Sequence, residues 1–255
     1  MKILVAVKRV MDANAPVHIR PDGLEVETQG ARMGINPFDE VALEEAVRLK
    51  ERGIASEIVA VALGDDATQD VLRHALALGA DRALLVNTQT SLQPLGVAKL
   101  LQAVVMREGP ELVLIGKQAI DDDAGQEGQM LAALLGWPQA TFVSSLQIEG
   151  QELQAVREIE GGTETLVMRL PAVVTADLRL NDPRFIKLPN LMQARKKPIE
   201  TLTADELGVD YTSRLVVERL SEPPVRAAGR RVANVAELVE CLQAEGRRLE
   251  IRELL

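Results

Sequence analysis

The residues best suited to bind a ligand lie in one loop, GKQAIDDDAGQEG, at residues 116–128. Its three glycines allow a ligand to approach the backbone closely. A helix is predicted to begin within the loop, and the free N–H groups at a helix start attract anions such as phosphate. The loop has neither the GxGxxG nor the Walker A spacing, so on its own it does not identify a nucleotide.

Three adjacent carboxylates in this loop, Asp121, Asp122 and Asp123, have two interpretations. They repel phosphate unless they point away from it, and Asp is also a favoured helix N-cap. The spacing favours capping over ligand contact. By the same reasoning Asn36 is predicted to cap a helix, and Lys117 to be a solvated or sheet-end lysine and not a phosphate ligand.

The remaining reactive side chains do not form a catalytic pattern. The two histidines, His18 and His74, fall on a predicted loop and helix surface, with no acid or nucleophile at triad spacing. Cys241 is predicted to be inert in the core, on the apolar side of a late helix. We therefore expect no metal site, and no independent enzymatic activity.

Short aliphatic runs alternate with helical segments over the first half of the chain. Buried strands are predicted at residues 2–7, 56–64, 82–86 and 111–116. Helices are predicted to start at Asn36-Pro37, at Asp65 or Asp66, at Pro94 and at the aspartate triplet, and to end near residues 53, 78, 106 and 135. This order predicts an α/β fold with a doubly wound, mostly parallel, Rossmann-like sheet.

The pattern changes after residue 137. Alternating residues predict a small antiparallel insertion at 142–169, with turns at 149–150 and 161–162, before another buried strand at 171–178. A hairpin is predicted around residues 21–23. We expect a nucleotide-binding domain at residues 1–200 and a C-terminal extension at 201–255, with a helix at 235–244, that packs on a partner or on its own domain.

Ligands of open parallel sheets bind beyond the carboxyl ends of the strands, where the winding direction reverses. Three predicted strand ends are candidates: Ala6-Val7, Leu63-Gly64 and the loop that follows Gly116. A site at this edge would draw on all three segments.

The composition excludes several functions. The 255 residues carry 29 basic and 38 acidic side chains, a net charge of −9, which argues against nucleic-acid binding. Aromatic residues make up only 2%, too few to enclose a flavin within this chain alone. No apolar run reaches the length of a membrane span, no targeting segment is evident, and the single cysteine suits a reducing compartment, so we expect a cytoplasmic protein that is not membrane-embedded.

Several long strings resemble the β subunit of electron-transfer flavoproteins. They are LVAVKRVMD, INPFDEVALEEAVRLKERG, ALALGADRALLV, LVLIGKQAIDDDAGQEGQMLAALLGWPQATF and VREIEGGTETLVMRLPAVVTADLRLNDPRFIKLPNLMQARKKPIE, in that order, to about residue 209. Unbroken strings such as GKQAIDDD and PAVVTADLRLN make the resemblance specific. Ala13 departs from it, where many members carry tyrosine.

The resemblance implies that this chain binds AMP structurally and shares one FAD held mainly by an α subunit. It places the cofactor-binding residues at Ala6, Asn36, Pro37, Phe38, Asp39, Leu63, Leu112, Val113, Gly116, Lys117, Gln118, Ala119, Ile120, Asp121, Asp122, Asp123, Ala124, Gly125, Gln126 and Glu127. Among them, Phe38 would face the flavin ring.

The resemblance also implies partner contacts. Glu158 would latch the flavin domain of the α subunit, and residues 176–198 would form a recognition loop for acyl-CoA and related dehydrogenases, whose electrons go on to a membrane quinone oxidoreductase. Leu188 would be the anchor, extended because Pro189 follows it. The other contacts of this loop would be Arg184, Lys187, Pro189, Asn190 and Met192.

Two other functions remain open. A bifurcating flavoprotein subunit would bind a second FAD in place of AMP, and a stand-alone sensor would bind an adenine nucleotide without a partner. The aspartate triplet favours AMP over a second FAD, and the recognition-loop string argues against a sensor.

Overall fold

A computed structural model describes residues 1–225 and 228–244 of the chain. The predicted C-terminal extension therefore lies partly outside the described residues, and the division of the chain at residue 200 stays a prediction. No helix in the described part is long and apolar enough to cross a bilayer.

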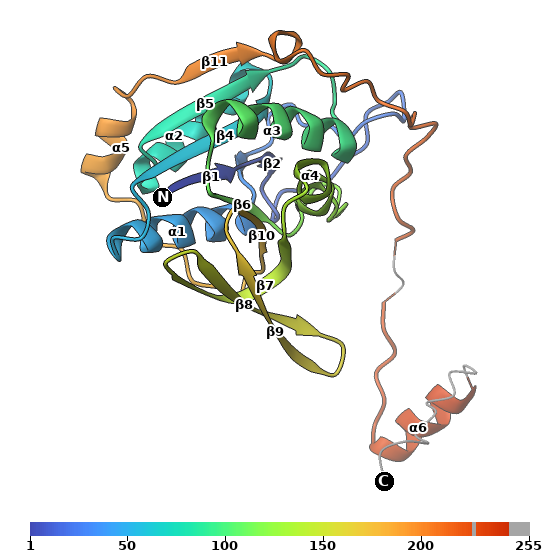
Figure 1. The fold of residues 1–255 in the computed structure, drawn as a ribbon. Coiled ribbons are helices and arrows are strands. Elements are labelled where there is room, and N and C mark those ends of the chain that lie inside the picture. Colours follow the sequence, from blue (N-terminus) through green and yellow to red (C-terminus); the bar gives the residue numbers. More distant parts are fainter. Residues whose placement is uncertain (226–227, 245–255) are drawn as a thin grey trace.

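One nine-stranded sheet forms the centre of the molecule, in the order β11-β5-β4-β1-β6-β10-β7-β8-β9 (Figure 1). The strands are β1 (Lys2–Ala6), β4 (Glu57–Gly64), β5 (Arg82–Asn87), β6 (Leu112–Gly116), β7 (Gln139–Glu149), β8 (Glu152–Ile159), β9 (Gly162–Arg169), β10 (Ala172–Ala176) and β11 (Glu200–Thr203). All neighbours from β11 to β7 are parallel, and only β7, β8 and β9 pair antiparallel. The predicted doubly wound, mostly parallel sheet is confirmed, and the antiparallel strands extend it.

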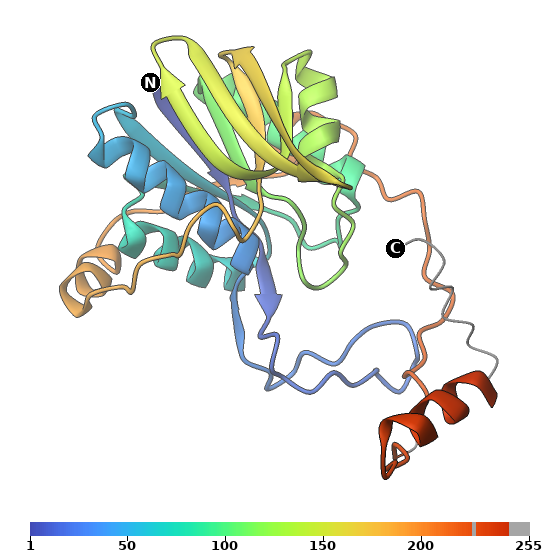
Figure 2. The same cartoon turned by 90° about the horizontal axis from the view of Figure 1, so that it is seen from below.

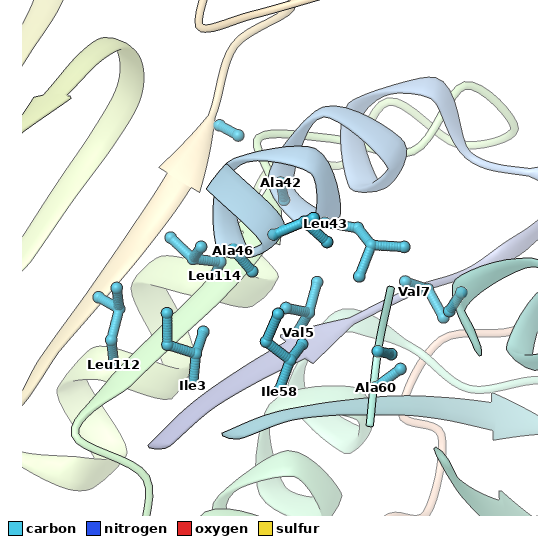
Figure 3. Close-up of a cluster of buried hydrophobic side chains, with 14 of the residues drawn as sticks. Ile3, Val5, Val7, Ala42, Leu43, Ala46, Ile58, Ala60, Leu112 and Leu114 are labelled. Atoms are coloured by element: carbon cyan, nitrogen blue, oxygen red, sulfur yellow. The ribbon is translucent and has the colours of Figure 1, made fainter. Parts of the chain in front are cut away.

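Helices cover both faces of this sheet. They are α1 (Pro37–Glu51), α2 (Gln69–Leu78), α3 (Pro94–Glu108) and α4 (Glu127–Leu135). Along β1, Ile3 and Val5 face the core formed with α1 and α2, whereas Leu4 faces the core formed with α3 and α4. This alternation follows from the two-residue period of a strand. Figure 3 shows Ile3 and Val5 beneath Leu43 and Ala46 of α1.

One helix start differs from the sequence prediction. The helix α4 begins at Glu127 with Gln126 at the cap position, and not at the aspartate triplet. The triplet forms its own turn, in which Asp123 has a φ of 49° and the Ala124 N–H donates to Asp122 Oδ1 at 3.1 Å. Asn36 does occupy the cap position of α1, but its side chain makes no capping bond. The prediction at Asp65 is confirmed, because its carboxylate accepts from the Ala67 N–H at the 3-10 turn η1 (Asp66–Thr68).

The remaining elements lie at the periphery. A two-stranded antiparallel sheet, β2 (Arg9–Met11) and β3 (Met33–Ile35), carries the predicted hairpin, in which the Gly23 N–H donates to the Arg20 carbonyl at 2.8 Å. Figure 2 shows this loop projecting towards the tail, where Leu220 N–H donates to the Gly23 carbonyl. The tail contains the 3-10 turn η2 (Asp205–Leu207) and the predicted helix α6 (Val235–Ala244), which lies apart from the sheet in Figures 1 and 2.

Candidate functional site

A cavity of about 420 Å³ lies at the carboxyl ends of β1, β4, β5 and β6. β1 is the strand at which the winding reverses, since the chain runs outward from it to β4 on one side and to β6 on the other. Loops that leave neighbouring strands towards opposite faces open a crevice at this point. The volume lies within the range of small-molecule pockets in proteins.

The predicted cofactor-binding residues divide into two groups. Ten line the cavity: Ala6, Asn36, Asp39, Leu63, Gly116, Gln118, Ala119, Asp121, Asp122 and Glu127. The other ten do not: Pro37, Phe38, Leu112, Val113, Lys117, Ile120, Asp123, Ala124, Gly125 and Gln126. Leu112 and Val113 are fully buried within β6, on opposite faces of the sheet.

Sequence reasoning missed one wall of the cavity. This wall follows the end of β5 and consists of Thr88, Thr90, Ser91 and Leu92, with Val97 and Leu101 of α3 behind it. Val7, Lys8, Arg9, Gly64, Asp65, Thr68 and Ile115 complete the lining. The strand-end rule that identified Ala6, Leu63 and Gly116 would also have found the end of β5, had it been applied to the third predicted strand.

Asn36 and Asp39 join the strands that border the cavity. The Asn36 side chain is fully buried, donates to the Gln118 carbonyl at 2.8 Å and accepts from the Ile120 N–H at 3.3 Å. Asp39 accepts from the backbone N–H groups of Lys8 at 2.8 Å and Gly116 at 2.9 Å. The predicted cap position of Asn36 is thus confirmed, but its side-chain amide binds a buried loop and not the N–H groups of the first turn.

Burial also changes the ionisation of Asp39. Removal from water raises the pKa of its carboxyl to about 7, although the hydrogen bonds from the Lys8 and Gly116 N–H groups and from Asn36 act in the opposite direction. The cavity floor therefore contains a carboxyl group that titrates near neutral pH.

The aspartate triplet is partly neutralised by a residue that sequence reasoning did not select. Lys8 Nζ lies 2.9 Å from Asp121 Oδ1 and 3.1 Å from Asp122 Oδ2. Burial opposes the charge of Lys8, but these two carboxylates outweigh it and raise the pKa of its ammonium. Asp123 accepts from Gln118 Nε2 at 2.7 Å. The repulsion that three carboxylates would exert on a phosphate is therefore reduced.

A second hollow, of about 430 Å³, lies beside Phe38 and is open to solvent. Its lining is Phe38, Lys117, Phe142, Glu158, Asp177, Leu178 and Arg179. Two residues predicted to act near a flavin, Phe38 and Glu158, thus border one surface, although they are far apart in the sequence. Glu158 forms an ion pair with Arg179.

Lys117 borders this hollow and directly follows β6, so the predicted sheet-end position is confirmed, although its side chain is only partly exposed. Its ammonium lies 2.8 Å from Asp177 Oδ2, 5.3 Å from the Phe38 ring centre and 5.8 Å from that of Phe142, within range of cation–π attraction. Phe142 has a φ of 59°, and the Thr175 hydroxyl accepts its N–H at 2.9 Å. Such a conformation persists only where neighbours hold it.

The predicted partner-binding residues lie on a segment that links β10 to β11 and contains the helix α5 (Leu188–Ala194). Leu188 is 71% exposed, and Lys187, Pro189, Asn190 and Met192 are exposed beside it. Leu188 is the first residue of α5, so the expected extended conformation is wrong. Pro189 fits the first turn of a helix because that turn needs no N–H at this position.

The other reactive side chains do not form a site in the described part of the chain. No group of three potential metal ligands is found there. His74 Nε2 lies 2.7 Å from Glu40 Oε1, so the expectation that it lacks an acid partner is wrong. Cys241 is half-buried on α6, which has no buried residue, and therefore does not lie in the core.

Comparison with known proteins identifies the family of the chain. A model of the electron transfer flavoprotein domain matches residues 23–207. The electron transfer flavoprotein subunit beta of Bradyrhizobium diazoefficiens is 52% identical over 245 residues, which cover 96% of this chain and 98% of that protein. The mitochondrial subunit beta of Arabidopsis thaliana is 50% identical over 247 residues (96% and 98%). The electron transfer flavoprotein subunit beta of Homo sapiens is 49% identical over 251 residues (97% and 98%). The chain therefore belongs to the electron transfer flavoprotein family, among its β subunits.

Proposed function

We propose that the chain is the β subunit of a heterodimeric electron-transfer flavoprotein that carries electrons and has no catalytic activity of its own. The cavity at the strand ends carries this proposal, because it has the size and position of a nucleotide site. Family membership over most of the chain supports it.

The cavity would hold AMP in a structural role. Its lining supplies apolar surface from Ala6, Leu63 and Ile115, hydroxyl groups from the loop after β5, and Lys8 beside the loop of residues 116–128. The first turn of α4 also borders it through Glu127, and N–H groups of a first turn have no partner within the helix.

The second hollow would complete the site of an FAD held mainly by an α subunit. Bound FAD would supply the redox chemistry by accepting and releasing electrons. Phe38, Phe142 and Lys117 offer an apolar surface with one cation, and the Arg179–Glu158 pair forms its charged border. In this proposal Glu158 exchanges Arg179 for a group of the flavin domain when that domain docks.

The exposed residues of α5 would dock acyl-CoA and related dehydrogenases. Leu188 would be an apolar anchor with a polar border, which suits a small and transient interface. Electrons would leave to a membrane quinone oxidoreductase, and the protein would act in the cytoplasm.

The C-terminal extension would pack on the α subunit. Its tail presents apolar side chains to solvent, with Leu215 77%, Val216 88% and Val225 99% exposed. Such a row is covered in a stable assembly, since it has no partner within the described part of this chain.

The bound nucleotides test this proposal directly. The chain is co-expressed with the α subunit of the same organism, the complex is purified and denatured, and the released nucleotides are identified and counted. One AMP and one FAD per heterodimer are expected. Two FAD would indicate the bifurcating type, and a colourless chain that binds adenine nucleotide but never pairs would indicate the sensor.

A further inference from the structure

The segment that carries Leu188 is attached to the domain at both ends. It leaves β10 at Asp177 and reaches β11 at Glu200, and the helix α5 lies against α2 between these points. In Figure 1 the segment passes from α1 to α2 at the periphery of the sheet. Its geometry therefore depends on what these two helices hold.

At the entry end, Arg184 clamps the segment to α1. Its guanidinium donates to Glu44 from Nε at 2.8 Å and to Glu51 at 2.9 Å, and its backbone N–H also donates to Glu44 at 3.3 Å. The Glu44 side chain is only 2% exposed. Burial opposes its ionisation, but the hydrogen bonds from Arg184 and Arg48 outweigh burial and lower the pKa of this carboxyl.

Two further contacts secure this end. Asn181 is buried and donates to the Val41 carbonyl at 3.1 Å and to Glu45 at 3.2 Å. Arg48 donates to the Asp182 carbonyl at 2.9 Å. The segment thus donates hydrogen bonds to α1, and α1 donates one to the segment, within a few residues of Asn181.

At the exit end, α2 holds the end of α5. Arg73 donates to the Ala194 carbonyl at 2.7 Å and also to the Lys197 carbonyl. Lys197 Nζ donates to the Ala80 carbonyl at 2.9 Å, so Lys197 is folded onto the domain. A guanidinium on the last carbonyls satisfies groups that a helix end leaves without partners.

Between these two ends, some side chains of the segment pack against the domain and others face solvent. Leu180, Ile186 and Leu191 are half-buried against the main core, and Ala194 is buried. Phe185, Leu188 and Met192 are 96%, 71% and 50% exposed. The exposed residues therefore lie on a segment that packs against the core and is hydrogen-bonded to the domain at both ends; this segment is the support of Leu188.

We propose that Arg73 and Arg184 are positioning residues for docking, which hold α5 so that Leu188 is presented in one fixed place. The inference rests on the proposed docking of dehydrogenases. Neither arginine need touch the partner. A support ordered before binding loses less conformational entropy on association, which strengthens binding without an added contact.

The test uses the heterodimer and an acyl-CoA dehydrogenase of the same organism with its acyl-CoA substrate. In the double variant Arg73→Gln/Arg184→Gln, the KM for the flavoprotein is expected to rise at least tenfold with kcat, FAD content and AMP content unchanged. Hydrogen exchange of the amides of residues 190–197 is expected to become faster. In the double variant Arg73→Lys/Arg184→Gln, the lysine keeps a donor for the two carbonyls. Its KM is expected to lie closer to the wild-type value than that of Arg73→Gln/Arg184→Gln.

The matched control is Arg20→Gln. Arg20 also forms an ion pair with a glutamate, Glu25, and its side chain is 44% exposed, against 36% for Arg184, but it lies in the loop between β2 and β3, away from the segment. Its KM is expected to stay at the wild-type value. In addition, Leu188→Ala is expected to cost less in the double variant than in the wild type, because coupled residues are not additive.

Either of two results overturns the inference while leaving the proposed function intact. One is an unchanged KM in the double variant despite faster exchange, and the other is unchanged exchange at residues 190–197. If the wild-type heterodimer accepts no electrons from any dehydrogenase, the proposed function and this inference both fail. The wild-type measurement thus separates the two kinds of failure.

Discussion

The side-chain amide of Asn36 donates to the carbonyl of Gln118 at 2.8 Å, across 82 residues of sequence. Its oxygen accepts from the Ile120 N–H, so one buried side chain ties the start of α1 to the loop that follows β6. Both Asn36 and Gln118 line the cavity at which a ligand would bind. The position of the loop is therefore set by α1 and not by the loop sequence alone.

Replacement of Asn36 by Asp is expected to destabilise the chain by about 1 to 3 kcal/mol, because the donor to Gln118 is lost and two oxygens then face each other in a buried place. Denaturant unfolding measures the change, and the bound nucleotide is expected to fall in parallel. Asn14→Asp at an exposed loop position serves as the control. Equal stability of the two variants would show that the hydrogen bond from Asn36 to Gln118 does not stabilise the fold.

Replacement of Gly116 by Ala is expected to disrupt the cavity. A Cβ at this position would lie 2.4 Å from Asp39 Oδ1 and 2.6 Å from Phe38 Cβ. Neither neighbour can move freely because both belong to the first turn of α1, so a loss of about 1 to 3 kcal/mol is expected, typical of overpacking. Gly162→Ala, which meets no atom within 4 Å, is the control. Thermal unfolding compares the two, and a wild-type-like Gly116→Ala would show that this close approach is unimportant.

The stability of the chain should depend on pH through Asp39. Its pKa is raised by burial from 3.8 to about 7, so between these values the folded chain binds the proton that the unfolded chain has released. Its contribution to stability therefore falls as pH rises from about 4 to about 7, by at most about 1.4 kcal/mol per pH unit, and is constant above. The measurement is the unfolding free energy of wild type relative to Asp39→Asn, which cannot titrate. A difference that grew with pH would indicate a lowered pKa instead.

Replacement of Lys8 by Met is expected to weaken AMP binding by about 1.5 to 3 kcal/mol, the usual value of a bond to a charged group. The variant leaves Asp121 and Asp122 without their cation at the edge of the cavity. Calorimetry on nucleotide-free protein measures the effect. Lys99→Met, which removes a lysine of α3 that binds the Asp210 carbonyl, should bind AMP normally. If both variants bind equally, Lys8 does not shape the site.

Replacement of Leu188 by Ala is expected to leave the heterodimer and its FAD intact but to weaken reduction by a dehydrogenase, by about 2 kcal/mol if Leu188 is a hot spot. The residue is 71% exposed, so its removal leaves no cavity in the fold. Stopped-flow reduction of the flavin measures the change. Val167→Ala on β9, at 59% exposure, is the control, and unchanged kinetics of Leu188→Ala would exclude its anchoring role.

The architecture could be predicted because it depends on local patterns. Aliphatic runs such as that of β1, and helix signals such as Pro37 at the start of α1 and Gly79 at the end of α2, are each contained in a short window. Strands that alternate with helices can form few sheets other than a parallel one. The exposed position of Leu188 also followed from its sequence string, although its helical conformation did not.

The details of the site could not be predicted in this way. Asn36 and the aspartate triplet were expected to cap helices, because Asn and Asp commonly do so, yet Asn36 binds a loop 82 residues away and Asp121 binds Lys8 across 113 residues. These partners meet because β6 lies beside β1 in the sheet. The sequence by itself determined which elements form and in what order they wind. The tertiary structure decided which strand ends are neighbours, and thus which buried polar groups must satisfy one another once water is excluded.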